Sequence, residues 1–155
     1  MATNRISVAK DKADLVKALT VTEGKNGPFQ TYADAIAFAA SLGAKRKKRV
    51  PLKEIAKREP APIDLDIFIS RGYEMAMKLI AIAETKDPKI LSINLENEAE
   101  RVKIFEEYAN GGLEILRDEF RGSVDYLEQL LLLLISERAN QDKPPEDFDL
   151  SRFLT

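Results

Sequence analysis

Apolar and polar residues alternate with two different periods along the chain. Residues 5–10 alternate in steps of two, which places Ile6 and Val8 on one side and polar or small residues on the other. A period of two is typical of a short, half-buried β-strand. From residue 11 onward, apolar residues recur every three or four positions, which is the spacing of amphipathic helices. The pattern therefore predicts a mainly α fold with one short N-terminal strand.

The helical spacing has clear start and stop signals. Gly43 has the place of a glycine just beyond a helix, Asp87 and Pro88 end another helix, and Asn110-Gly111-Gly112 separates two more. Between these signals, the spacing predicts helices over residues 11–19, 32–42, 64–84, 96–109, 113–120 and 124–138, with a short helical turn at 53–58.

This order of elements predicts three parts. Residues 1–58 form a strand–helix–helix module that includes a basic segment, residues 59–138 form a helical bundle, and residues 139–155 form an extended C-terminal tail. The tail is polar apart from four apolar residues that can contact the body, namely Phe148, Leu150, Phe153 and Leu154. The predicted architecture is a ribbon-helix-helix-like start followed by a helical bundle.

The composition limits the chemistry that the protein can perform. The chain has no Cys, His or Trp. It therefore has no disulfide, thiolate nucleophile, imidazole base or typical zinc site, and we expect no enzyme activity, cofactor or metal. We read no signal peptide, and no stretch of 18 apolar residues that would span a membrane, so we expect a cytoplasmic protein.

Charge is distributed unevenly although the net charge is only −2. Residues 1–58 contain 13 basic and 5 acidic residues, whereas residues 96–155 contain 7 basic and 15 acidic residues. The densest part of the basic half is the run Lys45, Arg46, Lys47, Lys48 and Arg49, which is followed by Lys53, Lys57 and Arg58. We call residues 45–49 the basic segment.

Two interpretations of the basic segment stay open. In the first it contacts DNA phosphates; with five contacts, the logarithm of the binding constant would fall with the logarithm of salt concentration at a slope of roughly −4 to −5. In the second it is solvated, or it pairs with the acidic C-terminal half of the chain.

The N-terminal strand also has two interpretations. A lone strand needs a partner for its backbone groups, and in ribbon-helix-helix proteins a second chain supplies it. In that arrangement Arg5 and Ser7 point to base edges in double-stranded DNA, Lys10 assists them, and Thr31 begins a helix whose free N–H groups can bind a phosphate. Alternatively, the strand pairs within its own chain, for instance with Lys48 to Leu52.

A group of carboxylates suggests a metal site as a further candidate. Glu107, Glu114 and Asp118 would converge if the helices on either side of the Asn110-Gly111-Gly112 interruption folded back on each other, and they could then hold Mg²⁺ for DNA hydrolysis. Carboxylates are also ordinary on exposed helix faces, where Arg117 and Arg121 can pair with them. No phosphate-binding glycine loop is present.

Two longer motifs resemble a known family. They are Gly27-Pro28-Phe29-Gln30-Thr31-Tyr32-Ala33-Asp34-Ala35-Ile36-Ala37-Phe38-Ala39-Ala40-Ser41-Leu42-Gly43 and Phe105-Glu106-Glu107-Tyr108-Ala109-Asn110-Gly111-Gly112-Leu113-Glu114. With the separation between them, they resemble the DNA phosphorothioation-associated protein 4 family over about residues 5–138. The resemblance implies a bacterial protein that accompanies a system placing sulfur in the DNA backbone, or restricting DNA without it. It implies no activity and no catalytic residue.

These observations lead to ordered hypotheses. The first is a non-catalytic DNA-binding accessory or regulatory protein of DNA phosphorothioation modification and restriction, acting as a homodimer through Arg5, Ser7, Lys10, Thr31 and Lys45 to Arg49. The second is an adaptor that binds other proteins of that system, through the helix at 64–84 and the one containing Leu130 to Ile135. The third, and least favoured, is a carboxylate–metal nuclease.

Overall fold

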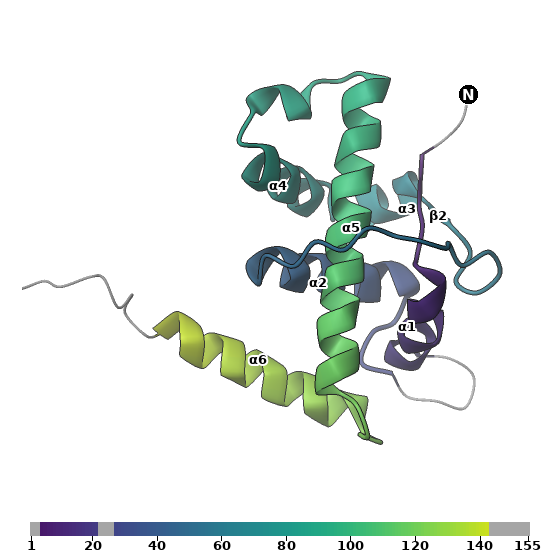
Figure 1. Ribbon diagram of the computed structural model, residues 1–155, viewed down its shortest axis with the longest axis vertical. Helices are drawn as coiled ribbons and strands as arrows, with labels where there is room; N and C mark the ends of the chain where they lie inside the picture. The colour runs from purple at the N-terminus through teal and green to yellow at the C-terminus, as the bar shows by residue number, and fades with distance from the viewer. Residues whose placement is uncertain (1–3, 22–26, 143–155) are drawn as a thin grey trace, which may run out of the picture.

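The mainly α fold predicted from the sequence is confirmed (Figure 1). The computed structural model describes residues 4–21 and 27–142. In chain order, with η marking 3-10 helices, the elements are β1 (Arg5–Ile6), η1 (Lys10–Lys12), α1 (Ala13–Leu19), α2 (Tyr32–Lys45), β2 (Ile63–Asp64), α3 (Leu65–Ser70), α4 (Glu74–Thr85), η2 (Pro88–Leu91), α5 (Leu95–Glu119) and α6 (Tyr126–Asp142). The four apolar tail residues from Phe148 to Leu154 lie outside the described residues.

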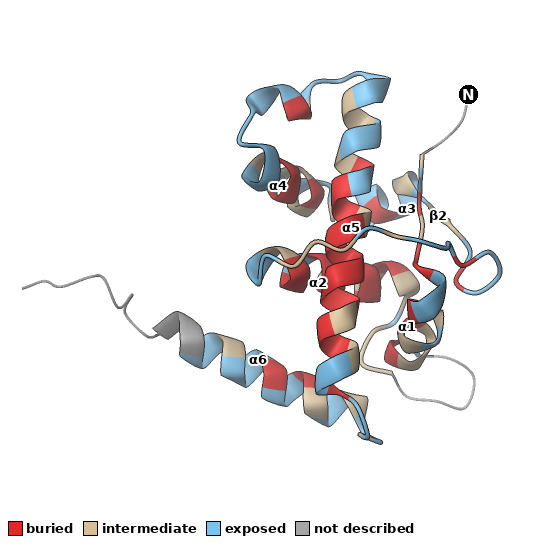
Figure 2. Cartoon of the chain, in the orientation of Figure 1, coloured by how far each residue is buried: buried red, intermediate tan, exposed pale blue. Residues whose placement is uncertain are grey.

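Helix α5 is the central element of the fold. It runs through the length of the molecule, with α2 packed across it (Figure 1), and its middle turns are the most completely buried part (Figure 2). The predicted interruption at Asn110-Gly111-Gly112 is wrong, because α5 continues through it. A Cβ atom on Gly112 would lie 1.7 Å from the carbonyl oxygen of Ala39 in α2, so only glycine lets the two backbones approach so closely.

Gly43 contributes to the same close contact from the α2 side. It lies inside α2 rather than beyond its end, as predicted, and a Cβ atom there would lie 2.1 Å from the carbonyl oxygen of Tyr108. The alanines of α2, such as Ala35 and Ala39, are fully buried and keep the helices close along their contact. The two motifs that carry the family resemblance are therefore the two sides of one helix–helix packing contact.

The predicted helix at 64–84 is divided in two. Helix α3 ends at Ser70 and α4 begins at Glu74, and between them Gly72 has a positive φ of 90°, a conformation that suits glycine. The side chain of Asp34 accepts hydrogen bonds from Arg71 and Tyr73, so α2 holds this bend in place. Residues 53–58 are described by the structure, and they do not form the helical turn that the sequence predicts.

The N-terminal strand pairs within its own chain. Strands β1 and β2 are antiparallel, with Arg5 opposite Asp64 and Ile6 opposite Ile63. The strand partner therefore comes from β2 of the same chain and not from a second chain. Pairing within the chain was one of the two interpretations, but the suggested partner segment, Lys48 to Leu52, is wrong. That segment lies along α5 instead, where the N–H group of Val50 donates to the carbonyl of Glu107 at 3.1 Å.

Helix α6 is the last described element. It begins where Asp125 accepts a hydrogen bond from the N–H of Glu128, and it continues to Asp142, four residues beyond the predicted helix end at 138. It leaves the lower end of α5 and passes beside α2 (Figure 1). Within the described residues, no helix is both long enough and apolar enough to cross a membrane.

Candidate functional site

The basic segment is neutralised largely by the acidic half of the same chain. Arg46 bridges two helices, because its guanidinium lies 2.7 Å from Glu119 at the end of α5 and 2.6 Å from Glu137 in α6. Lys45 reaches the other oxygen of Glu137 at 2.9 Å. The cations lower the pKa of Glu137, and Glu119 and Glu137 raise the pKa of Arg46, so each group stabilises the charged form of the other.

Lys48 and Arg49 are also paired, on the α4–α5 side. Lys48 lies 3.5 Å from Glu114, and Arg49 lies 2.7 Å from Glu107 and 2.9 Å from Glu84. The hydroxyl of Tyr108 donates to Glu84, and burial together with this carboxylate raises the pKa of Tyr108 to about 12. The ion pairs therefore join the irregular segment after α2 to both helices.

Lys47 differs from its neighbours in the basic segment. It is exposed and adopts a positive φ of 55°, and no ion pair of Lys47 is found within residues 4–21 and 27–139. The other four cations of the segment thus pair with five carboxylates, those of Glu84, Glu107, Glu114, Glu119 and Glu137. The second interpretation of the basic segment, pairing with the acidic half, describes the observed contacts.

The remaining residues predicted to contact DNA also have partners within the molecule. Arg5 lies 3.0 Å from Asp64 across the small sheet, and Lys10 lies 3.5 Å from Glu54. The side-chain oxygen of Thr31 accepts a hydrogen bond from the N–H of Asp34, so the predicted helix start is confirmed and this oxygen serves as its cap. Arg5, Lys10 and four of the five cations of the basic segment therefore all have a carboxylate partner within the chain.

Ser7 is half-buried beside α5. Its backbone N–H donates to Glu106 of α5 at 2.6 Å. Burial raises the pKa of Glu106, and the hydrogen bonds from Ser7 only partly oppose that rise. Ala9, the small residue on the predicted polar side of the strand, is buried.

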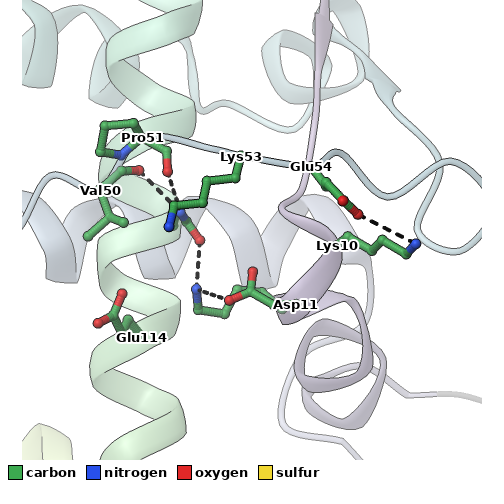
Figure 3. Close-up of a pocket in the computed structure, with 9 residues that line it drawn as sticks. Lys10, Asp11, Val50, Pro51, Lys53, Glu54 and Glu114 are labelled. Atoms are coloured by element: carbon green, nitrogen blue, oxygen red, sulfur yellow. Dashed lines mark hydrogen bonds and ion pairs between the residues drawn. The ribbon is translucent and has the colours of Figure 1, made fainter.

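A buried lysine, which the sequence analysis did not single out, lies beside the strand. The side chain of Lys12 is 2% exposed, and its ammonium group lies 3.0 Å from Oδ1 of Asn110 and 3.1 Å from Asp11. The amide nitrogen of Asn110 in turn donates to the carbonyls of Val50 and Pro51 (Figure 3). No periodic signal marks Lys12, because its buried position depends on contact with a residue 98 positions away.

These groups line an open groove of about 580 Å³ beside the irregular segment 50–54 (Figure 3). The charged side chains that line it are three lysines and three carboxylates, from Lys10, Lys12, Lys53, Asp11, Glu54 and Glu114. A second groove, of about 620 Å³, shares Lys10, Lys53 and Glu54 and continues past Lys57 and Arg58. The first groove has no net formal charge and does not select for an anion.

The carboxylate–metal arrangement weighed as the least favoured candidate is not found among the described residues. Because α5 is one continuous helix, Glu107, Glu114 and Asp118 cannot fold back onto each other. Each pairs with a cation instead: Glu107 with Arg49, Glu114 with Lys48 and Asp118 with Arg121. Among the described residues, no group of three or more acidic side chains is placed to hold a metal ion.

Helices α6 and α4 are among the elements that expose apolar side chains. On one side of α6, Leu127, Leu131, Leu134 and Ile135 are exposed; Leu132 is exposed outside this side, and Leu130 and Leu133 are buried. Figure 2 shows exposed and buried positions alternating along the helix. On α4, Met75 and Leu79 are exposed one turn apart. We call Leu127, Leu131, Leu134 and Ile135 the α6 stripe. We call Met75 and Leu79 the α4 stripe.

The described residues thus define a small helical protein in which the glycine-bearing contact of α2 with α5 is the core and the basic segment is held by internal ion pairs. A family model described as DNA sulphur modification system-associated protein 4 matches residues 5–153, and the chain belongs to this family. The resemblance seen in the two motifs is confirmed, and the protein is associated with the DNA sulphur modification system. Neither the curated proteins nor the solved structures gave a match.

Proposed function

We propose that the protein is a non-catalytic cytoplasmic adaptor that binds other proteins of the DNA sulphur modification system. The observation that carries the proposal is the pairing of four of the five cations of the basic segment with carboxylates of the same chain. The second hypothesis from the sequence is thereby favoured over direct DNA binding through this segment.

The ion pairs make the basic segment a poor site for DNA. To bind a phosphate, Arg46 would have to leave both Glu119 and Glu137, and these carboxylates would then repel the phosphate. Binding that exchanges one set of ion pairs for another releases few counterions, and counterion release supplies most of the affinity of basic proteins for DNA.

Exposed apolar side chains support a protein partner. Isolated exposed apolar residues are ordinary on a protein surface, but a contiguous set on one helix face is typical of an interaction site. The α4 stripe and the α6 stripe are two such faces, on the two segments named by the adaptor hypothesis. We assign the α4 stripe to a second protein of the system, for which it offers an apolar helix face.

The proposal is tested with purified components. Each protein of the sulphur modification system is mixed in turn with the full chain, and complex formation is followed by size-exclusion chromatography with light scattering. We expect one of them to co-elute, and we expect the double variant Met75→Glu/Leu79→Glu to lose the complex. Ile93→Glu is the matched control, because Ile93 is a fully exposed apolar residue outside both stripes. No complex with any component would contradict the proposal.

Direct DNA binding is kept as a second candidate because of a different group of cations. Lys53, Lys57 and Arg58 are exposed beside the second groove, and no ion pair of theirs is found among the residues that the structure describes. If DNA binds here, replacing all three with Ala should weaken binding and flatten its salt dependence, whereas Lys47→Ala should have little effect. The homodimer also stays a prediction. Because β1 already pairs with β2, the dimer interface must lie outside the strand.

A further inference from the structure

We infer that the α6 stripe is a self-association surface, which pairs antiparallel with the α6 stripe of a second copy of this chain. This inference goes beyond the adaptor function and is independent of it, because the adaptor function is assigned to the α4 stripe. The inference is carried by three observations on α6: where its apolar residues lie, how its body-facing side is fixed, and where its charges stand.

The apolar residues of α6 exceed what the protein body covers. Successive residues of a helix are separated by about 100° around its axis, so Tyr126, Leu130, Leu133 and Glu137 share one side. Together with Gln129, these are the described residues of α6 that the body buries or half-buries. Leu127, Leu131, Leu134 and Ile135 form a second side, within an arc of about 100° by the same spacing. That side is exposed along its whole length.

The body-facing side of α6 is fixed by ion pairs. Glu137 accepts from both Lys45 and Arg46, so the helix is held near its C-terminal half as well as at its start. The α6 stripe is therefore presented in one orientation before any partner binds. An interface that is already ordered loses less conformational entropy on association.

Two unpaired charges on α6 make the stripe complementary to itself. Glu128 stands near the start of the helix and Arg138 near its end, both are exposed, and no ion pair of either is found within residues 4–21 and 27–139. In an antiparallel pair centred on position 133, Glu128 of each copy meets Arg138 of the other, and Leu131 meets Ile135. A two-fold interface requires this reciprocity, since each contact occurs twice. A parallel pair would place like charges together.

The first test is the oligomeric state of the full chain over a range of concentrations, measured by light scattering. We expect a dimer that dissociates on dilution. Leu131→Glu should shift the dissociation constant by about 100-fold or more, because it buries two charges in the apolar contact. Leu132→Glu is the matched control: Leu131 is 52% exposed and Leu132 is 53% exposed, but Leu132 lies about 100° further around the helix, outside the stripe.

The second test uses the charges, and it does not depend on the apolar substitution. Glu128→Arg and Arg138→Glu should each weaken the dimer by placing like charges opposite each other, and the double variant Glu128→Arg/Arg138→Glu should restore it. Mixing the two single variants should form a mixed dimer, because opposite charges then face each other at both contacts. Circular dichroism would verify that each variant is folded.

The inference is overturned by several clear outcomes. One such outcome is a full chain that is monomeric at all concentrations. This outcome includes the case in which residues 143–155 of the same chain cover the α6 stripe. The dimer could also persist in Leu131→Glu, or respond equally to Leu132→Glu. Failure of the double charge variant to recover would show that the antiparallel arrangement is wrong. None of these results would alter binding of a partner through the α4 stripe.

Discussion

The ammonium group of Lys12 lies 3.0 Å from the side-chain oxygen of Asn110, although the two residues are 98 positions apart. Asn110 uses its amide nitrogen to bind the carbonyls of Val50 and Pro51, so its oxygen is fixed toward the lysine. One asparagine of the Asn-Gly-Gly motif therefore joins η1 and the segment after the basic run to the central helix. A buried ammonium group is tolerated only because Asn110 and Asp11 accept hydrogen bonds from it.

Loss of the Asn110 side-chain oxygen should destabilise the protein strongly. We expect Asn110→Leu to lower the free energy of unfolding by about 3 kcal/mol, because it leaves the Lys12 ammonium buried with one partner fewer. Lys12→Met combined with Asn110→Leu should recover part of this loss, since the buried ammonium group is then gone. Urea unfolding measures both, with Lys103→Met as the control on an exposed lysine of the same helix.

The contact of α2 with α5 should not tolerate a methyl group at Gly112. We expect Gly112→Ala to cost about 3 kcal/mol of stability and Gly112→Val to cost more, because the added Cβ meets a backbone carbonyl that no side-chain rotation can move. Helices without a packing constraint gain stability from Gly→Ala. A stabilised Gly112→Ala protein in thermal unfolding would therefore refute the described contact.

The raised pKa of Glu106 gives the fold a defined pH dependence. Because the folded pKa lies above the unfolded value, Glu106 contributes stability at pH values below the unfolded pKa, and this contribution is lost as pH rises through the folded pKa. Glu106→Gln still offers an oxygen to the N–H of Ser7 but cannot ionise. Its stability relative to the unmodified protein should therefore increase between acidic and neutral pH. Chemical unfolding across this range measures the difference, and a constant difference would contradict the assignment.

Arg46 should control how firmly α6 is held against the body. We expect Arg46→Ala to release ion pairs to two helices and to cost about 1 kcal/mol, the upper end of the range for exposed ion pairs. Hydrogen exchange should accelerate in α6 while the centre of α5 stays protected. Lys47→Ala removes a neighbouring cation for which the described residues show no ion pair, and it should leave the exchange of α6 unchanged.

The elements of the fold could be predicted from the sequence better than their contacts. Local signals gave the strand at Ile6, the helix start at Thr31 and the break at Asp87-Pro88, because each depends on residues a few positions apart. Gly111 and Gly112 led to a wrong prediction, because in the sequence alone they resemble the end of a helix. Their place in the middle of α5 depends on contact with Ala39 and Lys48, which no local pattern contains.

The candidate site shows the same division between local and distant information. The basic segment and the acidic C-terminal half were both visible in the sequence, and pairing between them was one of two interpretations. Deciding between the two required knowing that Glu119 and Glu137 come together at Arg46 from different helices. The buried Lys12 left no signal, because a lysine next to an aspartate is ordinary on an exposed helix face.

The central claim is that the basic segment acts inside the protein rather than on DNA, and duplex binding tests it most directly. Labelled plain and phosphorothioated duplexes are titrated with the full chain at salt concentrations from ~50 to ~200 mM, a range over which a protein with many phosphate contacts loses orders of magnitude in affinity. We predict that neither Lys47→Ala nor Lys48→Ala changes the affinity of the chain for either duplex. Tight binding with a salt slope of roughly −4 to −5 that these variants flatten would contradict the account.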